Sequence, residues 1–209
     1  MASTCVCGNA AGLDRFGIHL ATCKTGGGRH HPRHEGLTFG FMALCDQAGV
    51  VSIKVREDVG NILTDGKKLD FICYPSGVAY GGDATLGNPL AGHRNAGSAA
   101  GFLAAVEERK INKYWRGCNQ QSYRFTPVAL DIFGNQGPRT AKLVEALCAR
   151  IPAGSFNAPN WATTTPRAYW NQRLAVQVMK ATADCIIRLN KLIWDRASGA
   201  PVVPGLAQR

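Results

Sequence analysis

The chain has 209 residues, of which 45% are hydrophobic and 18% are charged, a composition that indicates a globular protein and argues against a disordered one. No apolar run approaches the roughly 18 residues of a membrane-spanning helix. The net charge is +10, from 24 basic and 14 acidic residues, which favours a polyanionic partner. A basic protein with no nucleic-acid role is the alternative. The first residues lack a basic segment followed by an apolar one, so we expect no secretory signal.

Hydrophobic periodicity and turn residues divide the chain into alternating helices and strands. A helix is predicted over residues 34–48, where Leu37, Phe41, Leu44 and Cys45 form one apolar stripe. The other predicted elements, in chain order, are strands over 50–55, 68–74 and 82–86, a helix over 96–115, a strand over 123–133, and helices over 138–151 and 165–194. This order predicts an α/β fold with one small mixed sheet flanked by helices.

The cysteines are expected to be free thiols. Of the eight, five stand singly inside apolar segments, where a thiol acts as a small hydrophobe. These five are Cys45, Cys73, Cys118, Cys148 and Cys185. With no secretory signal expected, a reducing compartment is the better prediction.

The remaining three cysteines lie in the segment over residues 5–34, which is rich in glycine, cysteine and histidine. Thiolate and imidazole groups of the kind that Zn²⁺ takes are supplied by Cys5, Cys7, His19 and Cys23. Only one residue separates Cys5 from Cys7, where two to four are usual, and the substitute ligands are His30, His31 and His34. Such a site would be structural, because four protein ligands leave no open position. The alternative is a frayed N-terminus.

A second group of polar residues interrupts apolar elements. Asp70 and Asp83, thirteen positions apart, lie on two predicted strands, and Thr85 shares a face with Asp83. Lys110 continues the inward stripe of the helix over 96–115, and Tyr114 follows one turn later. Two carboxylates and an ammonium group are a minimal set for holding Mg²⁺ or Mn²⁺ and an attacking water beside a phosphodiester. The same spacing also suits aspartates that satisfy turns and a lysine that extends to solvent.

Taken in order, these residues resemble the restriction-like endonuclease region that follows the reverse transcriptase in non-LTR retrotransposon polyproteins. The stretches that carry the resemblance span residues 5–135 and are Cys5-Val6-Cys7-Gly8, Gly17-Ile18-His19-Leu20-Ala21-Thr22-Cys23, Arg33-His34, Lys68-Leu69-Asp70, Asp83-Ala84-Thr85 and Lys110-Ile111-Asn112-Lys113-Tyr114. No single stretch is specific, but their order and spacing together are fairly so. That region combines a Cys/His zinc knuckle with a nuclease of the PD-(D/E)XK superfamily.

The resemblance implies a zinc knuckle over 1–32, a restriction-endonuclease-like core over 33–151, and a linker, C-terminal helix and loose tail over 152–209. It implies that Asp70 and Asp83 bind Mg²⁺, that Lys110 supplies the catalytic lysine, and that Tyr114 lines the site. Glu35 would be the helix glutamate found in many superfamily members. The expected activity is nicking of DNA to leave a 3′-hydroxyl primer. DNA, RNA of the parent element and a reverse transcriptase domain would be partners, in the nucleus, with no membrane association.

The chain departs from the family pattern at three places. Leu69 stands where proline usually precedes the aspartate, and Thr85 stands where the common motif has lysine. Activity therefore depends on Lys110 reaching the site from the helix. The third departure is the gap from Asp83 to Lys110, which is long and rich in glycine. No reverse transcriptase is present, so the chain is expected to be a fragment or a domesticated relic. Two rival predictions follow: a DNA-binding module that has lost catalysis, and an inert, poorly folded fragment.

Overall fold

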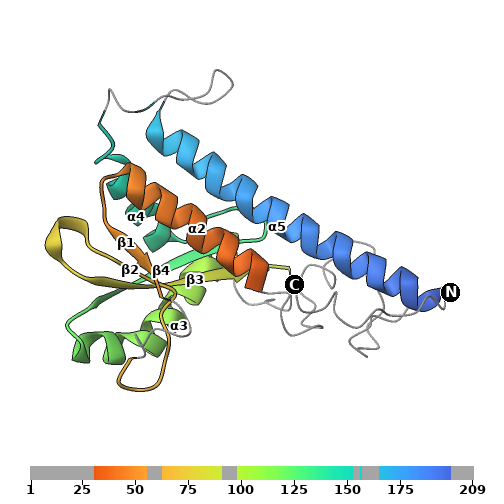
Figure 1. The fold of residues 1–209 in the computed structure, drawn as a ribbon, viewed down its shortest axis with the longest axis horizontal. Helices are drawn as coiled ribbons and strands as arrows, with labels where there is room; N and C mark the ends of the chain where they lie inside the picture. The colour runs from red at the N-terminus through yellow and green to blue at the C-terminus, as the bar shows by residue number, and fades with distance from the viewer. Residues whose placement is uncertain (1–30, 56–62, 91–97, 153–155, 157–164, 199–209) are drawn as a thin grey trace.

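The computed structural model describes residues 31–55, 63–90, 98–152, 156 and 165–198 (Figure 1). They form a four-stranded sheet in the order β1-β2-β3-β4, together with four α-helices and a short 3₁₀ helix. The strands are β1 (Ser52–Lys54), β2 (Phe71–Cys73), β3 (Tyr80–Gly87) and β4 (Arg124–Asp131). The helices are α2 (His31–Gln47), η1 (Pro75–Gly77), α3 (Ala99–Gln120), α4 (Pro138–Cys148) and α5 (Pro166–Ala197).

The sheet is mixed because the chain crosses over once. Strands β1, β2 and β3 pair antiparallel as a meander, and β4 then pairs parallel with β3. A parallel connection needs a crossover segment, and α3 lies between β3 and β4 in the chain and supplies it. Strand β2 covers only part of the longer β3, so one end of β3 extends past its partner.

Helices cover both faces of the sheet and create a core on each side. On one face, α2, α4 and α5 pack against alternate residues of the strands, including Phe71, Ala84 and Val128. On the other face, α3 buries Phe102, Leu103 and Val106 against Ala129. Further along α3, Tyr114 and Cys118 lie in a second cluster with Leu69 and Ile72. The molecule is therefore a three-layer arrangement with the sheet in the middle (Figure 1).

The predicted α/β class is confirmed, and each predicted helix and strand has a counterpart. The predicted stripe of α2 is buried, with Phe41, Leu44 and Cys45 all at 0% exposure. All five singly placed cysteines are buried, and none of them forms a disulfide. Helix α5 is more than a C-terminal addition, because Trp170, Leu174 and Val178 share the core with α2 and α4. No helix of the described segments is long and apolar enough to cross a membrane.

A buried glutamate joins α3 to the start of α4. Glu107 is fully buried, and its carboxylate accepts hydrogen bonds from Arg139 N at 3.0 Å and from Thr140 N at 2.9 Å and Thr140 Oγ1 at 2.8 Å. A side-chain oxygen that accepts from the first N–H groups of a helix satisfies donors that have no partner within that helix. Gly137 makes this approach achievable, because a Cβ there would collide with Glu107 Oε1.

Candidate functional site

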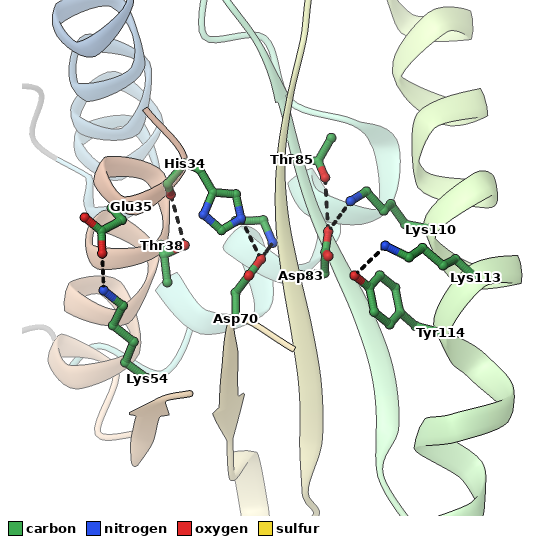
Figure 2. Close-up of polar contacts among 11 residues, drawn as sticks. His34, Glu35, Thr38, Lys54, Asp70, Asp83, Thr85, Lys110, Lys113 and Tyr114 are labelled. Atoms are coloured by element: carbon green, nitrogen blue, oxygen red, sulfur yellow. Dashed lines mark hydrogen bonds and ion pairs between the residues drawn. The ribbon is translucent and has the colours of Figure 1, made fainter. Parts of the chain in front are cut away.

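Asp83 lies in the middle of β3 and faces α3. Its Oδ2 is 2.7 Å from Lys110 Nζ and accepts a hydrogen bond from Thr85 Oγ1 at 3.0 Å. The Asp83 side chain is 6% exposed and that of Lys110 is 21% exposed, so the ion pair is largely shielded from water. Figure 2 shows Lys110 reaching Asp83 from the helix, with Thr85 on the same strand as Asp83. The predicted common face of Asp83 and Thr85 is confirmed.

Asp70 lies immediately before β2, at the point where this short strand leaves β3. Its backbone N–H donates to Gly82 O at 2.9 Å, and its side-chain Oδ2 accepts from Ala84 N at 2.6 Å. These two contacts fall on either side of Asp83 along the chain. The Asp70 carboxylate thus binds a backbone N–H of β3 beyond the end of the β2–β3 ladder. Asp70 was predicted inside a strand, but it lies at a bend, where its side chain binds that N–H.

His34 is part of this site. It lies in the first turn of α2, and its Nε2 is 2.8 Å from Asp70 Oδ2 (Figure 2). The sequence suggested His34 as a substitute zinc ligand, whereas the structure pairs it with an aspartate 36 residues away. The side chain of His31 and all of His30 lie outside the described part of the chain.

Tyr114 lies one turn beyond Lys110 on α3 and is buried at 4% exposure. It hydrogen-bonds Asp83, and its hydroxyl accepts a hydrogen bond from Lys113 Nζ at 2.9 Å. Burial, followed by the charge of Asp83, raises the pKa of Tyr114 well above its ordinary value. A phenol is protonated at neutral pH even at its ordinary pKa, so the hydroxyl can donate to the Asp83 carboxylate.

The hydrogen bond to Asp70 is the main cause that raises the pKa of His34. Burial opposes this rise, the negative charges of Asp70 and Asp83 add to it, and the positive charge of Lys110 lowers the pKa. His34 on α2 and Lys110 on α3 are therefore close enough to the same two carboxylates to influence each other. Figure 2 shows the two aspartates between α2 and α3.

Glu35 does not join the carboxylates. It follows His34 on α2 but pairs with Lys54 Nζ of β1 at 2.5 Å, and Figure 2 shows it directed away from Asp70. Adjacent residues of a helix point about 100° apart, so the turn that brings His34 to Asp70 carries Glu35 elsewhere. The assignment of Glu35 to the site was made from the family pattern, and the geometry does not support it.

The donor set suits Mg²⁺ better than a metal held wholly by protein. Mg²⁺ usually keeps several waters and is held by one or two carboxylates together with substrate phosphates. Asp70 and Asp83 could supply those two carboxylates. Within the described residues, no three His, Cys, Asp or Glu side chains group closely enough to hold a metal ion. The predicted zinc ligands Cys5, Cys7, His19 and Cys23 lie outside these residues.

Comparison with known proteins supplies no further assignment. Neither a scan against protein-family models nor a search of curated proteins found a match to this chain. The function must therefore be argued from the site itself.

Two residues with a role near the site escaped the sequence analysis. His34 was noticed as a substitute zinc ligand and as part of the Arg33-His34 stretch, but nothing local indicates a contact with Asp70 across 36 positions. Glu107 stands in the sequence Glu107-Glu108-Arg109-Lys110, which has the pattern of a solvated helix face. One signal was available: Glu107 directly follows Val106, a residue of the inward stripe that continues to Lys110.

Proposed function

We propose that the chain is a metal-dependent endonuclease domain that cleaves a DNA phosphodiester, with Asp70, Asp83 and Lys110 as the reacting group. The observation that carries this proposal is the contact of Lys110 Nζ with Asp83 Oδ2 at 2.7 Å. Because position 85 is threonine, the catalytic ammonium group has to come from another element. The contact supports its delivery from α3 to Asp83. The resemblance to restriction-like endonucleases and the charge of +10 point to the same substrate class.

Asp70 and Asp83 would hold the divalent cation, which when bound supplies charge neutralisation and an acidified water. Lys110 forms an ion pair with Asp83 and has three donor hydrogens. Its ammonium group would also bind a non-bridging phosphate oxygen, where a positive charge stabilises the negative charge that develops during hydrolysis. Tyr114 and Thr85 both hydrogen-bond Asp83 and hold its carboxylate toward α3.

The α/β architecture is compatible with a restriction-endonuclease-like fold, since Asp83 lies on β3, Asp70 immediately precedes the adjacent strand β2, and the lysine lies on the crossover helix between β3 and β4. A zinc knuckle in the first 32 residues is a part of the proposal that rests on its cysteine and histidine residues and on the resemblance. A reverse transcriptase as partner and a nuclear location rest on the resemblance alone.

A second candidate function is DNA binding without cleavage. It is favoured by two observations: Thr85 stands where the common motif has lysine, and Lys110 is already paired with Asp83. In this case basic side chains of the chain would bind phosphates and the carboxylate cluster would serve only the fold. The two functions differ in a single readout, magnesium-dependent strand breakage.

Nicking of supercoiled plasmid by the purified full chain, with Mg²⁺ or Mn²⁺, tests the proposal. We expect the wild type to produce nicked circles, and Asp70→Asn, Asp83→Asn and Lys110→Met each to abolish them. Asp65→Asn is a matched control, because Asp65 also pairs with a lysine, Lys67 at 2.7 Å, but at an exposed turn. Plasmid that is shifted on a gel but never nicked would favour the binding function instead.

A further inference from the structure

The hydrogen bond between His34 and Asp70 joins the first turn of α2 to the carboxylate site. Asp70 Oδ2 accepts from Ala84 N at 2.6 Å and lies 2.8 Å from His34 Nε2. An ionised carboxylate can only accept, so Nε2 must carry the proton in this contact. Asp70 therefore accepts one hydrogen bond from strand β3 and a second from helix α2.

Both donors approach the same oxygen of Asp70, and this has a geometric consequence. Two donors at Oδ2 restrict rotation of the carboxylate, whose side chain is 20% exposed. Oδ1 is then the oxygen that a cation could meet without displacing either donor. Without His34 the carboxylate would have Ala84 N as its remaining donor of the two. Either carboxylate oxygen could then accept from Ala84 N, and the fixed orientation of Oδ1 would be lost.

The backbone of α2 supports the histidine in turn. The hydroxyl of Thr38 donates to His34 O at 3.0 Å, and Thr38 is 1% exposed. The same helix is held to the core by Leu37 and Phe41, both buried. His34 thus projects from a rigid support, as a residue that orients another side chain must.

We propose that His34 is a positioning residue that holds Asp70 in the orientation needed to bind a divalent cation. The inference rests on the nuclease function proposed above, and it adds α2 to the elements that build the site. Hydrogen-bond donors behind a metal-binding carboxylate typically change metal affinity by about 10- to 100-fold when they are removed. The chain's own residues supply the arrangement, and no protonation change of His34 is required.

The test compares His34→Leu with His34→Gln. Leucine has similar bulk and no donor, whereas the glutamine amide nitrogen can reach the place of Nε2 and donate to Asp70. Binding of Mn²⁺ alone to the full chain is measured by titration calorimetry, and plasmid nicking is measured in parallel. We expect His34→Leu to weaken Mn²⁺ binding by about 10- to 100-fold and His34→Gln to remain within about threefold of wild type.

Lys54→Met is the matched control, because it breaks the α2–β1 ion pair with Glu35 without touching Asp70. We expect its Mn²⁺ affinity to equal that of the wild type, and thermal melting of all four proteins checks that each is folded. A structural role alone would lower the melting temperature of His34→Leu and His34→Gln alike and would produce no rescue of Mn²⁺ binding by glutamine.

The outcomes separate this inference from the proposed function. Weak Mn²⁺ binding and slow nicking in His34→Leu, restored in His34→Gln, support the inference. If the wild type nicks DNA and His34→Leu binds Mn²⁺ as tightly, the positioning role is refuted while the nuclease stands. A wild type that neither binds Mn²⁺ nor nicks DNA would overturn both, and equal losses in His34→Leu and His34→Gln would overturn the inference alone.

Discussion

Helix α3 takes part in two buried carboxylate clusters, which differ in the donors that each carboxylate accepts. Glu107 accepts from backbone N–H groups and the Thr140 hydroxyl at the start of α4. Asp83 interacts with the side chains of Lys110, Thr85 and Tyr114. Exchanging the partners of Glu107 would require a helix start to unfold, whereas those of Asp83 can change by rotation of side chains. The first cluster is suited to holding structure, and the second to accepting a ligand.

The largest expected effect tests the ligand-accepting cluster. We expect Lys110→Met to lower plasmid nicking by about 100- to 1,000-fold, since it removes one preorganised positive group from the reacting phosphate. Lys142→Met, an exposed lysine on α4, makes the same change in net charge and should leave nicking within about twofold of wild type. The measurement is the initial nicking rate at saturating Mg²⁺. Equal rates in the two variants would contradict a part for Lys110 in the reaction.

The structural cluster should respond in stability. We expect Glu107→Ala to lower the free energy of unfolding by about 3 kcal/mol, because two N–H groups and a hydroxyl at the start of α4 lose their acceptor. Glu108→Ala, the next residue, breaks an exposed pair with Arg139 and should cost under about 1 kcal/mol. Urea unfolding of both variants measures the difference. Similar midpoints for the two would contradict the distinct role of Glu107.

Moving the positive charge sharpens the comparison. The double variant Thr85→Lys, Lys110→Met places a lysine on β3, two residues after Asp83, where the common superfamily motif carries it. We expect it to recover about tenfold of the nicking lost in Lys110→Met, because the ammonium would again lie beside Asp83. Single-turnover nicking rates check this. No recovery would mean that the lysine must come from α3, and that the helix supplies more than charge.

The smallest expected effect concerns Tyr114. Tyr114→Phe removes the hydroxyl that hydrogen-bonds Asp83 and retains the ring that stacks on Phe125. The loss of one hydrogen bond corresponds to about a two- to tenfold reduction in nicking. The melting temperature should change little, because the buried ring is preserved. A loss as large as that of Lys110→Met would instead assign Tyr114 a direct part in the reaction.

Sequence pattern predicted those features that depend on local periodicity. The inward stripe of α3, Phe102, Val106, Lys110 and Tyr114, was readable because residues three and four apart share a helix face. The alternation of β3 likewise placed Asp83 beside Thr85. These two local patterns suggested a common site for Lys110 and Asp83, although the same spacing also suited a lysine that extends to solvent, and the resemblance was needed to give Lys110 a role there.

Features that depend on distant contacts were not predictable in the same way. The hydrogen bond from His34 to Asp70 spans 36 positions, and those from α4 to Glu107 span 32 and 33. No local propensity encodes such pairings, which arise only when layers pack. Asp70, predicted inside a strand, lies at a bend where its carboxylate binds Ala84 N, a contact that β-propensity does not describe.

Glu107 and Lys110 are three residues apart on α3, which corresponds to about 4.5 Å along the helix axis. A residue inserted in the chain before α3 would leave this spacing intact. A residue inserted between Glu107 and Lys110 would rotate one of them by about 100° relative to the other. Either the start of α4 would lose its cap or Lys110 would leave Asp83. Length variation among sequences that retain this site should therefore be absent from the segment between Glu107 and Lys110 and concentrated in the loops that flank α3.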